Sequence, residues 1–201
     1  MNRVALAAFV LALTCAVVSA QQPPGVRVSG TVESFDGRVL TVKSDKLGAV
    51  KINLADNTAV FGVMHATPAD LKPGAFIGIA GLPQPDGSIA AFSIHMFLPA
   101  QRGVVPDRHG PWDAKPNSTM TNAYVEDIVT AKDGETLTVK YKEGEKKIIV
   151  SPQTVIAAAA PGSKDELKPG AQIVIFGWDK QADGSVLAKV MYVGRDVVPA
   201  M

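Results

Sequence analysis

The chain has 201 residues, of which 47% are hydrophobic and 19% charged, and its 20 basic and 19 acidic side chains give a formal net charge of +1. A chain this close to neutral has no long-range field to attract nucleic acid or an anionic membrane surface, which argues against both as partners. The single cysteine cannot form an intrachain disulfide, so packing alone has to stabilise the fold.

The first 20 residues predict a secretory signal peptide. Arg3 precedes an uncharged run that begins at Val4, and the small residues Val18 and Ala20 end it, which is typical of a charged region, an apolar core and a cleavage site. The alternative is an uncleaved anchor, since residues 4–20 come close to the length of a membrane span. We expect cleavage after Ala20, which removes Cys15, leaves no transmembrane segment and places a neutral chain in the periplasm.

Residues 21–97 predict a first β unit. Apolar and polar residues alternate on both sides of Asp36-Gly37, which predicts a hairpin, and the same period of two continues from Val50 to Leu54. Two more strands are expected over residues 76–80 and 89–97. Between the third and fourth strands, Thr67-Pro68-Ala69-Asp70 places a hydroxyl at an N-cap and a carboxylate three residues later, so we expect one short helical turn there.

Two methionine and histidine pairs lie in this unit, and thioether with imidazole is a ligand set suited to copper. Neighbours in a strand point to opposite faces, so His95 and Met96 are poorly placed to hold one ion. Packing is therefore the favoured explanation, with no cofactor. The alternative is a copper site, for which the candidate ligands are Met64, His65, His95, Met96 and His109.

Residues 98–121 form a segment of 24 residues with four prolines and no clear period. Loops of this length are usually functional or act as linkers. Trp112 would be unusual in a plain spacer, so we expect the segment to fold back along the β units. The candidate ligand or partner site consists of Arg108, His109, Trp112, Asp113, Asn117, Thr119 and Asn122.

Two alternatives remain open for that segment. The same polar groups could satisfy the backbone of the loop and clamp the two β units together, with no ligand involved. An enzyme of unrecognised type would need a histidine and a carboxylate in one cleft, for which His109 and Asp113, four residues apart, are the favoured pair.

Residues 122–196 predict a second β unit, followed by a tail at 197–201. Three motifs recur in the same order and at similar spacing, which predicts an internal duplication. They are Asp36–Val42 with Asp133–Val139, Leu71–Ala75 with Leu167–Ala171, and Asp86-Gly87-Ser88 with Asp183-Gly184-Ser185.

Five strands with a helical turn between the third and fourth have the connectivity of a small Greek-key barrel. We therefore predict an all-β chain of two tandem five-stranded OB-like barrels. The sequence, with an acid before Leu-Lys-Pro-Gly-Ala and a later Asp-Gly-Ser, resembles an exported bacterial family known only as a domain of unknown function. The resemblance covers Val26–Phe97 and Asn122–Gly194 and implies a barrel-like fold, but its motifs are turns and caps and imply no activity.

The sequence contains no nucleophile elbow, no zinc-protease helix and no phosphate-binding loop. Few aromatic residues are available to stack on bases, which again argues against nucleic acid. The sequence therefore predicts an exported, non-enzymatic binding or assembly protein of the periplasm or cell envelope. Its partner would be an envelope protein or a small ligand, and a periplasmic metal-binding protein is the alternative.

Overall fold

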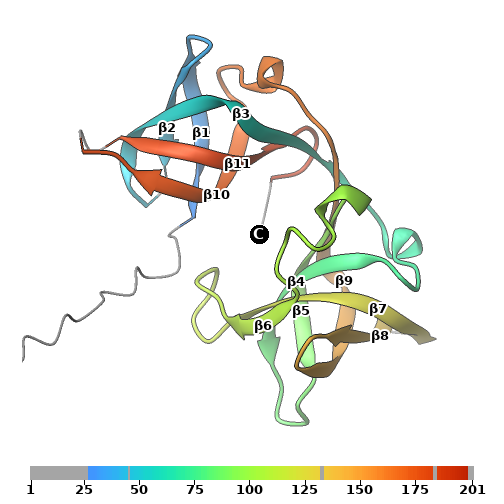
Figure 1. Ribbon diagram of the computed structural model, residues 1–201. Coiled ribbons are helices and arrows are strands. Elements are labelled where there is room, and N and C mark those ends of the chain that lie inside the picture. Colours follow the sequence, from blue (N-terminus) through green and yellow to red (C-terminus); the bar gives the residue numbers. More distant parts are fainter. Residues whose placement is uncertain (1–26, 45, 132–133, 183–184, 199–201) are drawn as a thin grey trace, which may run out of the picture.

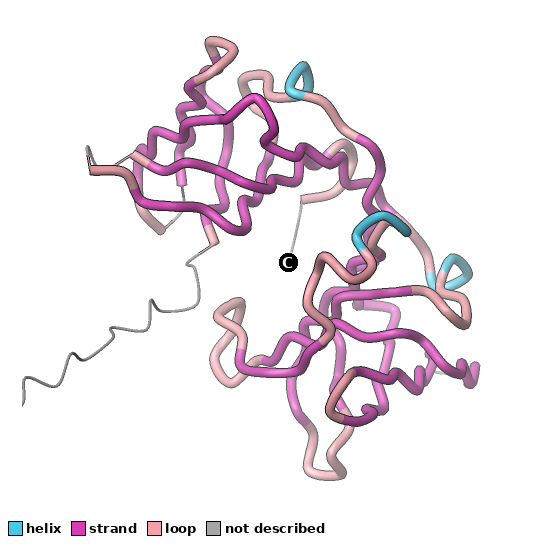
Figure 2. Tube along the Cα trace, in the orientation of Figure 1, coloured by secondary structure: helices cyan, strands magenta, loops and turns pink. Residues whose placement is uncertain are grey.

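The computed structural model describes residues 27–44, 46–131, 134–182 and 185–198. These residues form strands, turns and single-turn 3-10 helices, which confirms the predicted all-β class (Figures 1 and 2). The predicted signal peptide, residues 1–20, lies outside the described residues. In the described part of the chain, no helix has the length and apolar character needed to cross a membrane.

Eleven strands follow one another along the described chain. The N-terminal half, residues 27–97, contains β1 (Val28–Phe35), β2 (Val39–Ser44), β3 (Gly48–His65), β4 (Phe76–Pro83) and β5 (Ile89–Met96). The C-terminal half, residues 119–196, contains β7 (Thr119–Ala131), β8 (Gly134–Tyr141), β9 (Gly144–Pro161), β10 (Gln172–Lys180) and β11 (Val186–Gly194). The helix η2 (Pro99–Gln101) and the short strand β6 (Arg108–Pro111) lie between the halves.

Strand pairing closes two rings of five strands. Ring one runs β1, β2, β3, β11, β10 and back to β1. Ring two runs β4, β5, β9, β8, β7 and back to β4. The predicted five-stranded barrel is therefore present, but each ring combines three strands of one half with two of the other (Figure 1).

This exchange differs from the expected arrangement, in which each half closes its own barrel. Its physical cause is the length of β3 and β9, which span 18 residues each. Each of these strands begins in one ring and continues into the other, so the two strands that follow it complete the second ring. The sequence pattern predicted a strand of only five residues at 50–54, because the polar stretch after Leu54 is typical of a turn.

The long strands absorb their polar stretches as bulges. Residues 55–58 of β3 bulge opposite β11, where Ala188 pairs with Leu54 and Val190 with Ala59. The Thr58 hydroxyl donates to the Ala188 carbonyl at 2.9 Å, and Thr154 donates to the Ala91 carbonyl at 2.7 Å at the corresponding bulge of β9. Since these side chains replace the lost ladder bonds, each strand can continue past its bulge.

The rings meet where β3 and β9 cross. Phe61–His65 pairs antiparallel with Ala157–Pro161, and the pairing is centred on Val63 opposite Ala159. The backbones approach so closely that a Cβ on Gly162 would lie 2.6 Å from the Gly62 nitrogen. Only a residue without a side chain fits at this position.

Each ring has its own apolar core, and both halves of the chain contribute to each core. Ring one buries, from the C-terminal half, Leu167, Ile173, Ile175, Val186, Ala188, Met191 and Val193. Ring two buries, from the N-terminal half, Ala66, Leu71, Ile77, Ile79, Ile89, Ala91 and Ile94. Neither half can therefore complete a core alone in this arrangement.

The predicted helical turns are present as the 3-10 helices η1 (Pro68–Asp70) and η3 (Lys164–Glu166). The Thr67 amide donates to the Asp70 carboxylate at 2.8 Å, and the Ser163 amide donates to the Glu166 carboxylate at 3.0 Å. The spacing of hydroxyl and carboxylate predicted these turns. Each turn follows a long strand and precedes the two strands that enter the other ring.

Candidate functional site

The segment between the halves is folded against both rings. After η2, the strand β6 pairs with β7, with Arg108 opposite Asn122 and Pro111 opposite Thr119. The expectation of an irregular segment up to residue 121 is therefore wrong, because β6 is a strand and β7 already begins at Thr119. The loop that joins β6 to β7 extends toward ring one (Figure 1).

The tip of this loop clamps the two rings together. The indole of Trp112 stacks on Phe176 of β10, with ring centroids 6.3 Å apart, and the Arg27 guanidinium lies 5.6 Å from the Trp112 ring. The Asp113 carboxylate lies 3.6 Å from Arg27 Nε and 3.2 Å from Lys46 Nζ. These contacts join a hairpin of ring two to residues of ring one.

Ser118 and two predicted site residues, Asn117 and Asn122, hold the hairpin together. The buried hydroxyl of Ser118 lies 3.0 Å from the Trp112 carbonyl, and Asn117 adopts a positive φ of 60° in the turn. The side-chain amide of Asn122 donates to the Pro106 carbonyl at 2.9 Å. The Thr119 hydroxyl is buried without a hydrogen-bond partner among the described residues.

His109 is placed beside the hairpin and away from Asp113. Its Nδ1 lies 2.8 Å from the Thr121 hydroxyl, and its ring centroid is 5.8 Å from that of Tyr141. Burial lowers the pKa of His109, and the nearby Lys146 lowers it further. Because Asp113 contacts Arg27 and Lys46, the structure does not join His109 and Asp113 into an acid and base pair.

The stem of the segment lines a groove on ring two. Two adjoining hollows of about 430 and 500 Å³ share Asp107, Tyr124 and Lys142. We call them together the stem groove. The remaining lining residues are Gly103, Val105, Pro106, Glu126, Lys140 and Tyr141.

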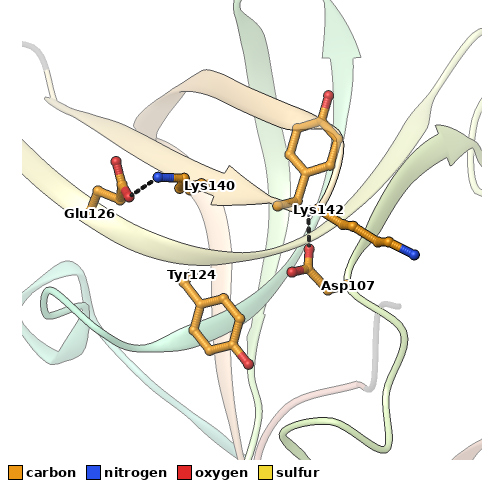
Figure 3. Close-up of a pocket in the computed structure, with 6 residues that line it drawn as sticks. Asp107, Tyr124, Glu126, Lys140 and Lys142 are labelled. Carbon is orange, nitrogen blue, oxygen red and sulfur yellow. Dashed lines mark hydrogen bonds and ion pairs between the residues drawn. The ribbon is translucent and has the colours of Figure 1, made fainter.

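Three of the four charged side chains of the stem groove have a partner within the protein, namely Asp107, Glu126 and Lys140. The Lys142 amide donates to Asp107 Oδ1 at 3.1 Å, and the Glu126 carboxylate lies 3.4 Å from Lys140 Nζ (Figure 3). Tyr124 packs on Phe76 with ring centroids 4.7 Å apart, which fixes its ring at the groove wall. Among the described residues, the hydroxyls of Tyr124 and Tyr141 have no hydrogen-bond partner, so both are free to meet a ligand.

Ring one lacks the aromatic residues of this groove. Val32 exchanges backbone hydrogen bonds with the Gly170–Ala171 turn, and Val125 exchanges the same bonds with the Gly74–Ala75 turn, so the two valines occupy equivalent positions. Thr31 then stands in ring one where Tyr124 stands in ring two. Ser44 likewise stands where Tyr141 does, because Val42 pairs with Val32 as Val139 pairs with Val125.

Sequence reasoning missed the groove residues because they alternate in the strands like ordinary barrel positions. One signal was available. All three tyrosines of the chain follow residue 121, although the predicted first unit has the same strand pattern.

The two methionine and histidine pairs lie in shared rows across β3, β9 and β5. Met64 and Met96 both pair with Ala158, and His65 and His95 both pair with Ala157. The sequence did not predict this neighbourhood, because it depends on the exchange of strands between rings.

His95 is enclosed by aromatic rings. It is 1% exposed, its Nε2 has no hydrogen-bond partner among the described residues, and burial lowers its pKa to about 3. Its ring centroid lies 5.0 Å from that of Phe97 and 5.1 Å from that of Tyr192. The Tyr192 hydroxyl accepts a hydrogen bond from the Gln101 side chain at 2.7 Å, and burial raises its pKa to about 12.

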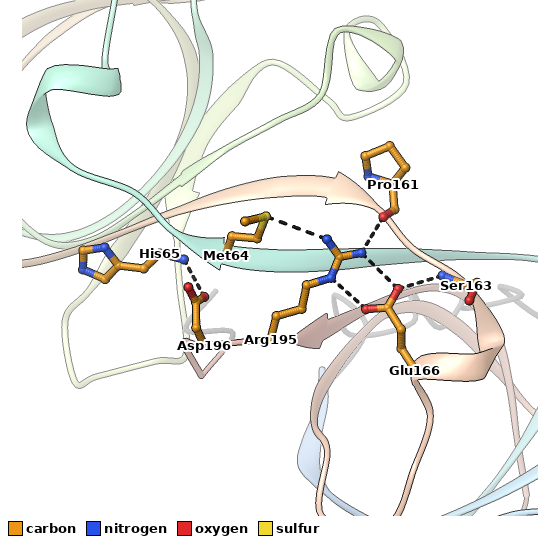
Figure 4. A network of polar contacts seen from close by, with 7 residues as sticks. All are labelled: Met64, His65, Pro161, Ser163, Glu166, Arg195 and Asp196. Carbon is orange, nitrogen blue, oxygen red and sulfur yellow. Dashed lines mark hydrogen bonds and ion pairs between the residues drawn. The ribbon is translucent and has the colours of Figure 1, made fainter.

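Met64 has a cationic neighbour. Its sulfur lies 3.8 Å from the Arg195 guanidinium, which also donates to the Pro161 carbonyl at 2.7 Å and binds Glu166 at 2.9 Å (Figure 4). A fixed guanidinium disfavours a metal ion at this thioether. No three His, Cys, Asp or Glu side chains of the described chain are grouped to hold a metal ion. The copper hypothesis therefore stays a prediction.

Residues 29–95, which are 67 of the 201 residues, match the model of a domain of unknown function, DUF5666. The chain is similar to this family over β1 to β5, strands that here belong to both rings. No curated protein matches the chain, and no solved structure matches it.

Proposed function

We propose that the protein is a non-enzymatic binding protein of the periplasm or cell envelope that holds a polar ligand in the stem groove. The observation that carries this proposal is the convergence of Asp107, Tyr124 and Lys142 around both hollows. The signal peptide predicted at residues 1–20 would export the chain to that compartment.

The position of the groove supports binding rather than packing as its role. The loop tip has its contacts with ring one, so the clamp at Trp112 does not use the groove residues. The groove instead lies where an irregular stem meets two strands of a closed ring, and binding residues are often carried on such segments over rigid scaffolds.

We also propose that both rings are OB-like barrels and that the chain arose by duplication. The same pairing order in both rings supports this, as do the equivalent bonds of Val32 and Val125. In this proposal the stem is an addition to the duplicated unit, and it lies against ring two, where it lines the stem groove.

Amide chemical shifts can test the binding proposal. We would titrate the labelled mature protein with a library of small polar metabolites and envelope fragments, and expect the shift changes to centre on Lys142 and Tyr141. Tyr141→Ala and Lys142→Ala should each weaken binding about fivefold or more, as truncation of a contact residue does. Lys43→Ala is the matched control, because Lys43 on β2 occupies the position in ring one that Lys140 has on β8.

Binding that moves signals only outside the groove, or that survives both groove substitutions, would contradict the proposal. Tyr141→Phe separates the hydroxyl from the ring, and thermal melting of each variant shows whether it folds.

A further inference from the structure

We infer that the ligand of the stem groove is a neutral glycan, an inference that rests on the function proposed above. The argument uses the charge of the groove, its extent and its hydrogen-bonding groups.

The formal charges of the stem groove cancel. The residues that line it include two carboxylates, Asp107 and Glu126, and two ammonium groups, Lys140 and Lys142. The ion pair of Glu126 with Lys140 and the hydrogen bond from the Lys142 amide to Asp107 partly satisfy the acids within the protein. A polyanion would need an excess of cations, and a cationic ligand would need an excess of acids, so a neutral ligand fits this balance best.

The groove offers donors and acceptors side by side. The phenol groups of Tyr124 and Tyr141 and the ammonium of Lys142 can donate, while the carboxylates of Asp107 and Glu126 accept. A sugar hydroxyl donates and accepts at once, so a row of hydroxyls can use both kinds of group. The Tyr141 ring provides apolar surface for the C–H face of a sugar ring, whereas the Tyr124 ring packs on Phe76 and has the Arg102 guanidinium over it at 6.0 Å.

The groove also has room for more than one sugar unit. The two hollows overlap at three residues and continue from Gly103 and Val105 on the stem to Glu126 and Lys140 on the strands. A ligand with several linked units can occupy both hollows, whereas a single compact molecule would fill one of them.

The test measures binding of defined probes to the mature protein by calorimetry and amide shifts. The neutral probes are hexamers of glucose and of N-acetylglucosamine, the acidic probe is oligogalacturonate, and the other probes are single-stranded DNA and a mixed-charge peptide. We expect a neutral hexamer to bind in the groove with an affinity that changes less than about twofold between 50 and 300 mM salt, since no charge is neutralised. Tyr141→Ala should weaken it about fivefold or more, and Lys43→Ala should not.

Each other outcome has a definite meaning. Groove binding of the acidic probe, the DNA or the peptide, with no neutral hexamer bound, overturns the glycan inference and leaves the proposed binding function standing. No groove binding by any probe, while the metabolite library does shift Lys142 and Tyr141, also overturns only the inference. Absence of groove binding in both experiments overturns both.

Discussion

Cutting the chain between its halves should leave two fragments that stay together. A protease site inserted between Gly103 and Val104 would be cleavable, because Val104 is 78% exposed. The N-terminal fragment then holds β1 to β5 and the C-terminal fragment β6 to β11. Each ring still needs strands from both fragments, so we expect the cut protein to elute as one species.

The expected affinity between the two fragments follows from the side chains that each half buries in the other half's ring. Apart from alanines, the C-terminal half places six aliphatic side chains in the core of ring one, and the N-terminal half places five in ring two. At about 2 kcal/mol for each buried side chain, this gives roughly 22 kcal/mol, an upper value for the gain. Loss of rotational and translational freedom takes about 10 kcal/mol of it. The remainder, about 12 kcal/mol, corresponds to a dissociation constant in the nanomolar range, which is the tightest binding that this burial supports.

Size exclusion with light scattering would measure the mass of the cut protein in native buffer and in increasing urea, with the uncut insertion variant as control. Fragments separated in urea and mixed again should restore the original far-UV spectrum and melting temperature. Two separate folded species in native buffer, each with its own melting transition, would refute the strand exchange, since each half would then close its own barrel.

Three further results are expected. Gly162→Ala should lower the free energy of unfolding by about 1–3 kcal/mol, because the added methyl group would meet backbone atoms of β3. Gly110→Ala is the control, since a methyl group there would meet nothing within 4 Å. Equal urea midpoints for the two variants would contradict the close approach of β3 and β9. Burial lowers the pKa of His95 from 6.5 to about 3, so the unfolded chain takes up a proton first as the pH falls. The contribution of His95 to stability should then decrease by roughly 1.4 kcal/mol per pH unit as the pH falls from about 6.5 to about 3, and urea titrations of His95→Phe should show a smaller decrease. The hydrogen bond from Arg195 holds the pKa of Glu166 below its usual value, so that contribution is present above about pH 4.5 and is lost at lower pH. Arg195→Lys should cost about 1 kcal/mol at pH 7 and weaken the dependence of stability on acid pH. An unchanged melting curve at pH 7 would contradict a stabilising role of the Arg195–Glu166 ion pair.

Local patterns predicted the strands and turns, but they could not predict which strands close which ring. Alternation identified β1 and β2, and the spacing of Thr67 and Asp70 identified the turn η1. The exchange depends on whether β3 bends back or continues after residue 58, which is decided by pairing with β9 nearly 100 residues away. The local sequence is compatible with either path of β3, so tertiary contacts decide between them.

The candidate site shows the same limit. Trp112 was expected to pack, and it does stack on Phe176 of ring one. The groove residues Tyr124 and Tyr141 were missed, because they become neighbours of Asp107 only when the stem lies across β7 and β8. The polar residues of the loop stand out in the sequence, but Ser118 and Asn122 form their side-chain hydrogen bonds within the segment itself.

Because β3 and β9 belong to one chain, the residues on the two sides of their contact can differ, which they could not in a pair of identical chains. Around the centre at Val63 and Ala159, the imidazole of His95 on β5 faces the phenol of Tyr192 on β11. On the proposal that the two halves arose by duplication, two identical subunits would present the same residue from both sides. Here the two sides differ, and Gln101 from the connecting segment serves the single phenol. A single chain can therefore place different residues on the two sides of this contact.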